Sequence, residues 1–173
     1  MKIDQRMKRV RLILSDVDGV MTDGGITYDN QGIETKTFHV RDGMGIKLWQ
    51  KSGYKFGVIT ARSSHIVKVR MDELKVDFIR QGSEEKLAAA TQIVNELGLE
   101  LEDVCYIGDD LTDAPLLAAV GMSVTVADGA SDLHSKVDLV TKTAGGQGAI
   151  RELIESILKS QNRWAEILQS WTV

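Results

Sequence analysis

Two aspartates, Asp16 and Asp18, follow directly after the apolar run at residues 10–14, and Gly19 comes next to turn the chain. A strand that ends in two acids is costly unless something positive faces them, such as a metal, a phosphate-binding lysine, or both. Carboxylate oxygens, backbone carbonyls and phosphate oxygens are the ligands that Mg²⁺ prefers. Taken alone, this pattern is also common in turns and calcium-binding loops, and a metal-assisted carboxylate that acts on a phosphorylated substrate is the alternative.

The rest of the chain supplies further parts of such a site in order. Thr60 follows a second apolar run, Lys86 begins a helical pattern, and Asp109 follows a third run. We expect Asp16 to attack phosphorus and form an aspartyl-phosphate, with Asp18 as the acid and then the base. Lys86 and Thr60 would bind the phosphate. Asp16, Asp109 and the backbone carbonyl of Asp18 would hold Mg²⁺.

Two more acids, Asp110 and Asp113, are expected to orient the metal ligands from outside. Several of these residues also have a simpler explanation when taken alone. Asp113 precedes Ala114 and Pro115, which is typical of a helix N-cap, and a lone Lys86 is usually a solvated helix residue. Each residue of the set stands at the end of a predicted strand or the start of the next helix, and this order favours the catalytic interpretation.

The elements that must position these residues alternate along the chain. Strands are predicted at residues 10–14, 55–59, 76–79, 104–107, 122–126 and 137–140. Helical patterns lie at residues 43–51, 63–74 and 83–97, and Gly98 is the expected C-cap of the third. This alternation predicts an α/β fold with a mostly parallel sheet and helices on both faces. Without a linker or repeat, one domain over residues 1–173 is expected.

The stretch at residues 25–40 interrupts this rhythm. It is typical of a β-hairpin, with strands at 25–28 and 33–40 around a turn. A hairpin inserted there would project over the carboxyl end of the first strand, where ligands bind in open α/β sheets. At the other end of the chain, Trp164 and Trp171 continue an apolar helical face. They are equally suited to cap their own core or to cover a neighbouring subunit.

Composition narrows the class of protein. The net charge of −4 argues against broad binding to nucleic acid. No run of 18 apolar residues and no apolar leader is present, so neither a membrane span nor a signal peptide is expected. The single cysteine, Cys105, lies in an apolar run and fits a buried thiol in a reducing cytoplasm.

The ordered motifs resemble those of the haloacid dehalogenase-like phosphatases. Segments 14–24, 38–46 and 144–152 more narrowly resemble the family of 3-deoxy-D-manno-octulosonate 8-phosphate (KDO 8-phosphate) phosphatases. The resemblance implies a Rossmann-like core without a separate cap domain, and Mg²⁺-dependent hydrolysis of a phosphorylated sugar acid for lipopolysaccharide synthesis. It also implies a homotetramer in which the hairpin and tail of one subunit close the next subunit's site. The family's catalytic, phosphate and metal positions fall on Asp16, Asp18, Thr60, Lys86 and Asp109.

One position departs from the family. Ala61 stands where the family usually has glycine, so positive φ is lost there. Arg62, which follows it, is our candidate for the carboxylate of a sugar-acid substrate, because a guanidinium can grip a carboxylate through two hydrogen bonds. A surface ion pair is the simpler explanation for Arg62. Arg41 is a weaker candidate of the same kind.

Three alternatives remain at this stage. A related phosphatase that acts on a sialic-acid-type nine-carbon 9-phosphate would use the same catalytic set, although segment 144–152 favours the octulosonate. A phospho-accepting receiver module also groups acids, a threonine and a lysine, but there the lysine follows the later strands, whereas Lys86 precedes Asp109. A non-catalytic assembly domain has no physical need for the buried pair Asp16 and Asp18.

Overall fold

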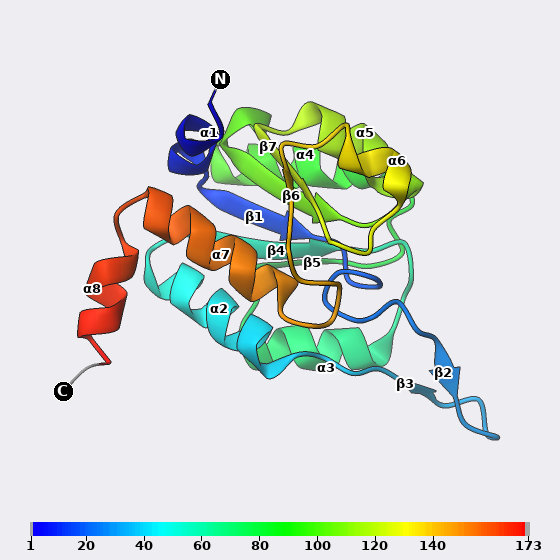
Figure 1. Ribbon diagram of the computed structural model, residues 1–173. Coiled ribbons are helices and arrows are strands. Elements are labelled where there is room, and N and C mark those ends of the chain that lie inside the picture. Colours follow the sequence, from blue (N-terminus) through cyan, green and yellow to red (C-terminus); the bar gives the residue numbers. More distant parts are fainter. Residues whose placement is uncertain (1, 172–173) are drawn as a thin grey trace.

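A computed structural model describes residues 2–171 and places six parallel strands in one sheet (Figure 1). The strand order is β5-β4-β1-β6-β7-β8, and each neighbouring pair is parallel. Their bounds are β1 Leu12–Ser15, β4 Lys55–Ile59, β5 Phe78–Arg80, β6 Val104–Gly108, β7 Met122–Thr125 and β8 Leu139–Val140. The predicted parallel α/β sheet is confirmed, and each predicted strand of the sheet overlaps an observed one.

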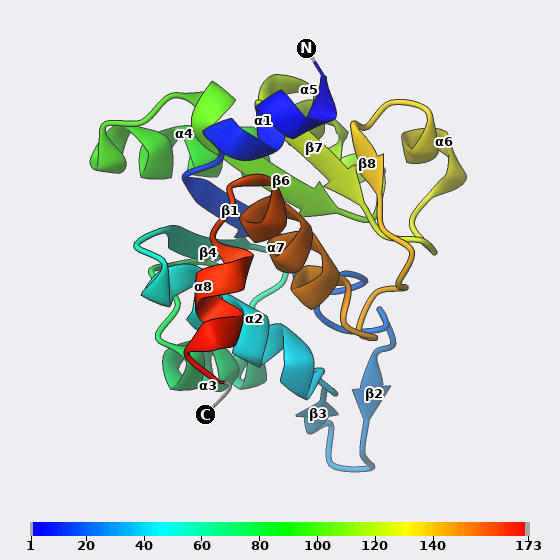
Figure 2. The ribbon, with the colours of Figure 1, turned by 60° about the vertical axis from the view of Figure 1, so that its left-hand side comes forward.

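Helices cover both faces of the sheet (Figures 1 and 2). One face packs against α1 Ile3–Arg9, α2 Val40–Lys51, α3 His65–Leu74, α7 Ala149–Ser160 and α8 Trp164–Gln169. The other packs against α4 Lys86–Leu97, α5 Ala114–Ala119 and α6 Ser131–His134. Two short 3₁₀ helices, η1 Leu101–Asp103 and η2 Leu111–Asp113, flank β6. Gly98 ends α4 with φ +63°, which confirms the predicted C-cap.

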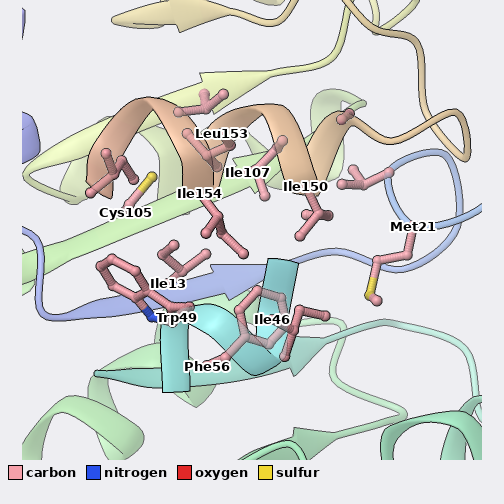
Figure 3. Close-up of a cluster of buried hydrophobic side chains, with 14 of the residues drawn as sticks. Ile13, Met21, Ile46, Trp49, Phe56, Cys105, Ile107, Ile150, Leu153 and Ile154 are labelled. Carbon is pink, nitrogen blue, oxygen red and sulfur yellow. The ribbon is translucent and has the colours of Figure 1, made fainter. Parts of the chain in front are cut away.

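The central strand is apolar on both sides, because a buried parallel strand must fill two cores. Ile13 joins the core under α2 and α7, whereas Leu12 and Leu14 join the core under α4 and α5. Figure 3 shows Ile13 between Trp49 of α2 and the apolar face of α7. Each such buried side chain contributes about 1.5–3 kcal/mol. The two cores thus fix the position of the strand that carries the acidic pair.

The predicted hairpin is present but much shorter than expected. It consists of β2 Thr27–Tyr28 and β3 Glu34–Thr35, paired antiparallel, and its turn points away from the sheet (Figure 1). The expectation of a strand up to residue 40 is wrong, because Val40 already begins α2 and His39 is its N-cap. Strand pairing ends at Thr35, and the next side chain, that of Lys36, is buried and paired with Asp18.

The two C-terminal tryptophans have different environments. Trp164 is only 9% exposed and belongs to its own chain's core, with the guanidinium of Arg151 5.3 Å from its ring centroid. Trp171 is 62% exposed. Trp164 therefore caps the core of its own subunit, as the first alternative expected. Trp171 lies on the surface, where covering a neighbouring subunit stays a prediction. Within residues 2–171, no helix is long and apolar enough to span a bilayer.

Candidate active site

Neighbouring strands bring the predicted residues together at one edge of the sheet. Asp16 follows β1, Thr60 follows β4 and Asp109 follows β6, and β1 lies between the other two strands. Carboxyl ends of adjacent parallel strands meet at the same edge. A pocket of about 160 Å³ opens there. It is lined by Asp16, Asp18, Thr60, Ala61, Arg62, Lys86, Asp109, Asp110 and Thr112.

Lys86 is the cation at the base of this pocket. Its Nζ donates to Asp16 Oδ2 at 2.7 Å and to Asp113 Oδ1 at 2.6 Å, and the residue is 3% exposed. Burial lowers the pKa of Lys86, but the two carboxylates outweigh this effect and leave that pKa above its usual value. The ammonium is therefore charged near neutral pH, and the solvated-helix explanation for Lys86 is wrong.

Asp113 organises the site from below the pocket. Besides Lys86, its carboxylate accepts hydrogen bonds from the Tyr106 hydroxyl at 2.5 Å and from the backbone N–H groups of Asp109 at 2.9 Å and Asp110 at 3.1 Å. These four donors fill the acceptor capacity of one carboxylate. Asp113 does stand at the N-cap of α5, but its side chain makes no capping bond there. Asp113 is thus placed to orient Lys86 and the backbone of Asp109 and Asp110.

The side chain of Asp110 has a local role. Its Oδ1 accepts from the N–H of Leu111 at 2.7 Å and so caps η2, and the residue is exposed. Its backbone N–H donates to Asp113 Oδ2 at 3.1 Å, and its carbonyl oxygen accepts from the N–H of Asp113 at 2.9 Å. The two acids that we expected to act alike are therefore placed differently, one buried beneath the pocket and the other at its edge.

The remaining acids form a crowded group that suits a divalent cation. Oxygens of Asp16, Asp109 and Asp113 lie within 4.8 Å of one another. Burial, together with the charges of Asp16 and Asp113, raises the pKa of Asp109 to about 7. Burial and Asp113 raise the pKa of Asp16 to about 6, although Lys86 opposes this. Since the donors to Asp113 occupy its oxygens, Asp16 and Asp109 are the carboxylates that fit Mg²⁺.

Position 19 needs a glycine for two reasons. Its φ is +91°, which side chains disfavour, and an added Cβ would overlap the Asp109 carboxylate. On the far side of this loop, the N–H of Gly146 donates to the carbonyl of Val20 at 3.0 Å, so the glycine-rich segment before α7 supports the loop after β1.

Asp18 and Arg62 meet the base of the hairpin at the mouth of the pocket. Asp18 Oδ1 is ion-paired with Nζ of Lys36, and its Oδ2 lies 3.7 Å from Nε of Arg62. Arg62 Nη2 donates to Glu34 Oε1 at 2.8 Å. Our sequence reasoning missed Lys36 and Glu34. Their spacing was the available signal, because residues two apart in a strand share a face.

The departure at Ala61 is small in conformational terms. Among residues 2–171, positive φ outside glycine occurs at Lys75 and Asn162, so Ala61 has an ordinary backbone. Thr60 is 2% exposed, and its Oγ1 accepts from the N–H of Arg62 at 3.3 Å. The loss of glycine therefore strains nothing here.

Arg41 does not join this site. It lines another pocket, beside Gln147 and Arg151 near the start of α7. Arg41 and Arg62 line different pockets, so the structure does not support the prediction that Arg41 binds the substrate carboxylate.

Comparison with known proteins identifies the family. The model of the haloacid dehalogenase-like hydrolases matches residues 76–153. A 3-deoxy-D-manno-octulosonate 8-phosphate phosphatase from Yersinia pestis is 43% identical over 159 residues, which cover 92% of this chain and 85% of the relative. The chain belongs to the KDO 8-phosphate phosphatase family. This membership, together with the chain order of Lys86 and Asp109, removes the receiver alternative.

Solved structures of KDO 8-phosphate phosphatases have the same fold. The Moraxella catarrhalis enzyme, solved with a magnesium ion, a phosphate ion and KDO, superposes with a TM-score of 0.96. It is 39% identical, with 98% of each chain covered. The Yersinia pestis structure gives a TM-score of 0.93 at 42% identity, covering 94% of this chain and 88% of that one. The Rossmann-like, haloacid dehalogenase-like architecture is thereby confirmed.

The crowded acids predict that Mg²⁺ stabilises the protein more at pH 8 than at pH 5.5. Folding raises the pKa of Asp16 and Asp109 from 3.8 to about 6 and 7. In the metal-free protein, their protonation therefore favours folding at low pH, and this contribution fades as the pH rises from 3.8 through 7. A bound cation requires the deprotonated carboxylates, so its stabilising effect grows over the same range.

Thermal unfolding at both pH values, with and without Mg²⁺, measures this effect. At 100 times the dissociation constant, Mg²⁺ should add about 2.7 kcal/mol to the free energy of unfolding. The variant Asp109→Asn should lose most of the Mg²⁺-dependent shift. An equal shift in Tm at the two pH values would contradict the assignment of these carboxylates as metal ligands.

Proposed function

We propose that this protein is a Mg²⁺-dependent phosphatase that hydrolyses KDO 8-phosphate to KDO and inorganic phosphate. The observation that carries the proposal is the placement of Asp16 at the base of the pocket, 2.7 Å from Lys86 and grouped with Asp109. Asp18 stands two residues farther along, at the pocket mouth. The substrate named for the Yersinia pestis relative supports the choice of sugar.

In the first step, a carboxylate oxygen of Asp16 attacks phosphorus and the bond from phosphorus to the sugar oxygen breaks. Asp18 gives its proton to that leaving oxygen. Its Oδ2 is buried without a hydrogen-bond partner among residues 2–171, which leaves this atom available to the leaving group. Lys86 and Thr60 hold the phosphoryl oxygens, and Lys86 also keeps Asp16 in place.

In the second step, Asp18 takes a proton from water, the water oxygen attacks phosphorus, and the bond to Asp16 breaks. The carboxylate of Asp16 is restored and inorganic phosphate leaves. Asp16, Asp109 and the backbone carbonyl of Asp18 would hold Mg²⁺. When bound, the ion would cancel the repulsion between the phosphate dianion and Asp16.

The size of the pocket agrees with a substrate that extends beyond it. Its volume of about 160 Å³ is small beside the roughly 300–1,000 Å³ of pockets that enclose a whole small ligand. The sugar must therefore lie at the mouth, where the Arg62 side chain is 39% exposed. A guanidinium at this position favours a sugar acid over a neutral sugar.

We propose a homotetramer of single-domain subunits over residues 1–173, acting in the cytoplasm in lipopolysaccharide sugar synthesis. Apolar side chains on the hairpin support an oligomer, since Ile26, Tyr28 and Ile33 are 49%, 56% and 56% exposed. Trp171 adds a further exposed aromatic side chain near the C-terminus. The unpaired buried thiol of Cys105 fits a reducing compartment. Neither nucleic acid nor a membrane is expected as a partner.

Phosphate release with Mg²⁺ present tests the proposed substrate. We expect KDO 8-phosphate to be preferred strongly, by kcat/KM, over a sialic-acid-type 9-phosphate and over p-nitrophenyl phosphate, and chelation by EDTA to stop all turnover. Preference for the nine-carbon substrate would replace the octulosonate but keep the mechanism. Turnover that survives complete chelation would exclude the metal-assisted route.

A further inference from the structure

Thr22 lies at the centre of the loop that follows β1 and carries Asp18, and it is only 1% exposed. Its Oγ1 accepts hydrogen bonds from the N–H of Gly19 at 3.3 Å and from the N–H of Gly24 at 3.2 Å. The same hydroxyl donates to the carbonyl of Val17 at 3.4 Å. One side chain therefore uses its donor and both acceptor lone pairs inside the loop, which closes around it.

The hydrogen bond from Gly19 concerns a candidate metal ligand. The N–H of Gly19 belongs to the same peptide unit as the carbonyl of Asp18, and this unit is planar and trans. Because the N–H is directed at Thr22, the carbonyl must point the opposite way. Gly19 also lies against Asp109, whose carboxylate an added Cβ would overlap. The Asp18 carbonyl is thus fixed beside a carboxylate that fits Mg²⁺.

The carbonyl oxygen of Asp18 is open for a ligand. Within the described part of the chain it accepts no hydrogen bond, whereas the carbonyls on either side do. Val17 accepts from the N–H of Met21 at 2.9 Å, and Val20 accepts from the N–H of Gly146 at 3.0 Å. An unused carbonyl oxygen next to paired acids is a ligand that suits a hard divalent cation.

We propose that Thr22 is a positioning residue for Mg²⁺, whose hydroxyl holds the Asp18–Gly19 peptide so that the Asp18 carbonyl is presented to the ion. The inference rests on the proposed function, in which this carbonyl is a metal ligand. A hydrogen bond from the N–H also polarises the peptide, which makes its oxygen a better ligand. Thr22 does not line the pocket, so it acts through the peptide and not by contact with substrate.

The segment before α7 holds Thr22 in place from the outer side of the loop (Figures 1 and 2). The N–H of Gly146 donates to the carbonyl of Val20, two residues before Thr22. Gly145 packs so closely that an added Cβ would overlap the carbonyl of Gly19. A hydroxyl on such a fixed backbone sets the orientation of its partner with little freedom.

Titration calorimetry of Mg²⁺ into the metal-free protein tests the role of Thr22. We expect Thr22→Val, which keeps the shape but removes the hydroxyl, to raise the Kd for Mg²⁺ roughly tenfold. Thr22→Ser restores the acceptor and should bring Kd back close to the wild-type value. Thr91→Val is the matched control, because Thr91 Oγ1 bonds only the Leu87 carbonyl of its own helix, at 2.8 Å, and Kd should not change.

A second measurement separates positioning from a merely structural role. In Thr22→Val, the Mg²⁺ concentration that gives half-maximal phosphate release should rise by the same factor as Kd, while kcat at saturating Mg²⁺ stays close to wild type. A threonine that only stabilises the loop would lower the Tm of the metal-free protein and leave Kd unchanged, and this result would overturn the inference. If Thr22→Val does not fold, Thr22→Ala should show the same rise in Kd.

Failure of the proposed function would have a different signature. Wild-type protein that binds Mg²⁺ but releases no phosphate from KDO 8-phosphate would contradict the proposed activity, and the ratio of Kd values would still decide the role of Thr22. Wild-type protein that binds no Mg²⁺ would overturn both.

Discussion

The variant Asp16→Asn is expected to lose phosphate release by roughly 10⁴-fold or more, because the group that attacks phosphorus is gone. An amide nitrogen is not a nucleophile at neutral pH, and the neutral side chain is a poorer ligand for Mg²⁺. The loss should be similar for KDO 8-phosphate and p-nitrophenyl phosphate, since both would pass through the same aspartyl-phosphate.

The fold should survive this substitution. The side-chain carbonyl of asparagine can still accept the hydrogen bond from Val17 N–H, which reaches Asp16 at 2.7 Å. Lys86 keeps its ion pair with Asp113 at 2.6 Å, so no buried cation is left alone. One of three crowded acids has also become neutral, which relieves the repulsion that raises the pKa of Asp109.

Initial rates and thermal unfolding of the same preparation separate the two effects. Asp132→Asn, at an exposed position of α6, is the matched control and should keep both wild-type rate and wild-type Tm. Mass spectrometry of the wild-type protein after rapid quenching should show one added phosphoryl group. Turnover near the wild-type rate in Asp16→Asn would exclude Asp16 as the nucleophile.

Site residues could be predicted from the sequence where they stand at the end of a recognisable strand or the start of a recognisable helix. Asp16, Thr60 and Asp109 each follow an apolar run, and parallel strands deliver their carboxyl ends to one edge without further information. Lys86 was recognisable from its order in the chain and its place at the start of α4. The sheet and the base of the pocket could therefore be predicted.

Contacts between distant segments could not be predicted in the same way. Lys36 reaches Asp18 across 18 positions and Glu34 reaches Arg62 across 28, and no local period encodes such pairs. Arg62 was our candidate for a substrate carboxylate, with a surface ion pair as the simpler explanation, and in the structure it pairs with Glu34 of the hairpin. The hydrogen bond from Tyr106 to Asp113 could not be predicted for another reason. Tyr106 lies in the middle of a buried strand, where an aromatic residue is expected for packing alone.

Removal of the lysine ammonium in Lys86→Met is expected to cost about 3–5 kcal/mol of unfolding free energy in metal-free protein, the range for breaking a buried ion pair from one side. Lys86 is 3% exposed and is the partner of two carboxylates, Asp16 and Asp113. Without it, the acids beneath the pocket face each other with no lysine between them. Mg²⁺ should recover part of the lost stability, because its charge serves the same carboxylates.

Turnover of Lys86→Met should fall by about 10²–10³-fold, the usual effect of losing one donor to a developing charge. Urea unfolding and initial rates measure the two losses. Lys68→Met is the matched control, since Lys68 pairs with Asp72 on the surface with 61% of its side chain exposed. Its free energy of unfolding should change by no more than about 0.5 kcal/mol.

A second substitution separates charge from shape. Lys86→Arg keeps the positive charge but replaces a compact ammonium with a planar fork, which cannot reproduce the 2.7 Å and 2.6 Å contacts in the same space. It should therefore restore more of the stability than of the turnover. If Lys86→Met unfolds with wild-type free energy, the acids under the pocket do not depend on Lys86 for their charge balance. The arrangement proposed for Asp16 would then be wrong.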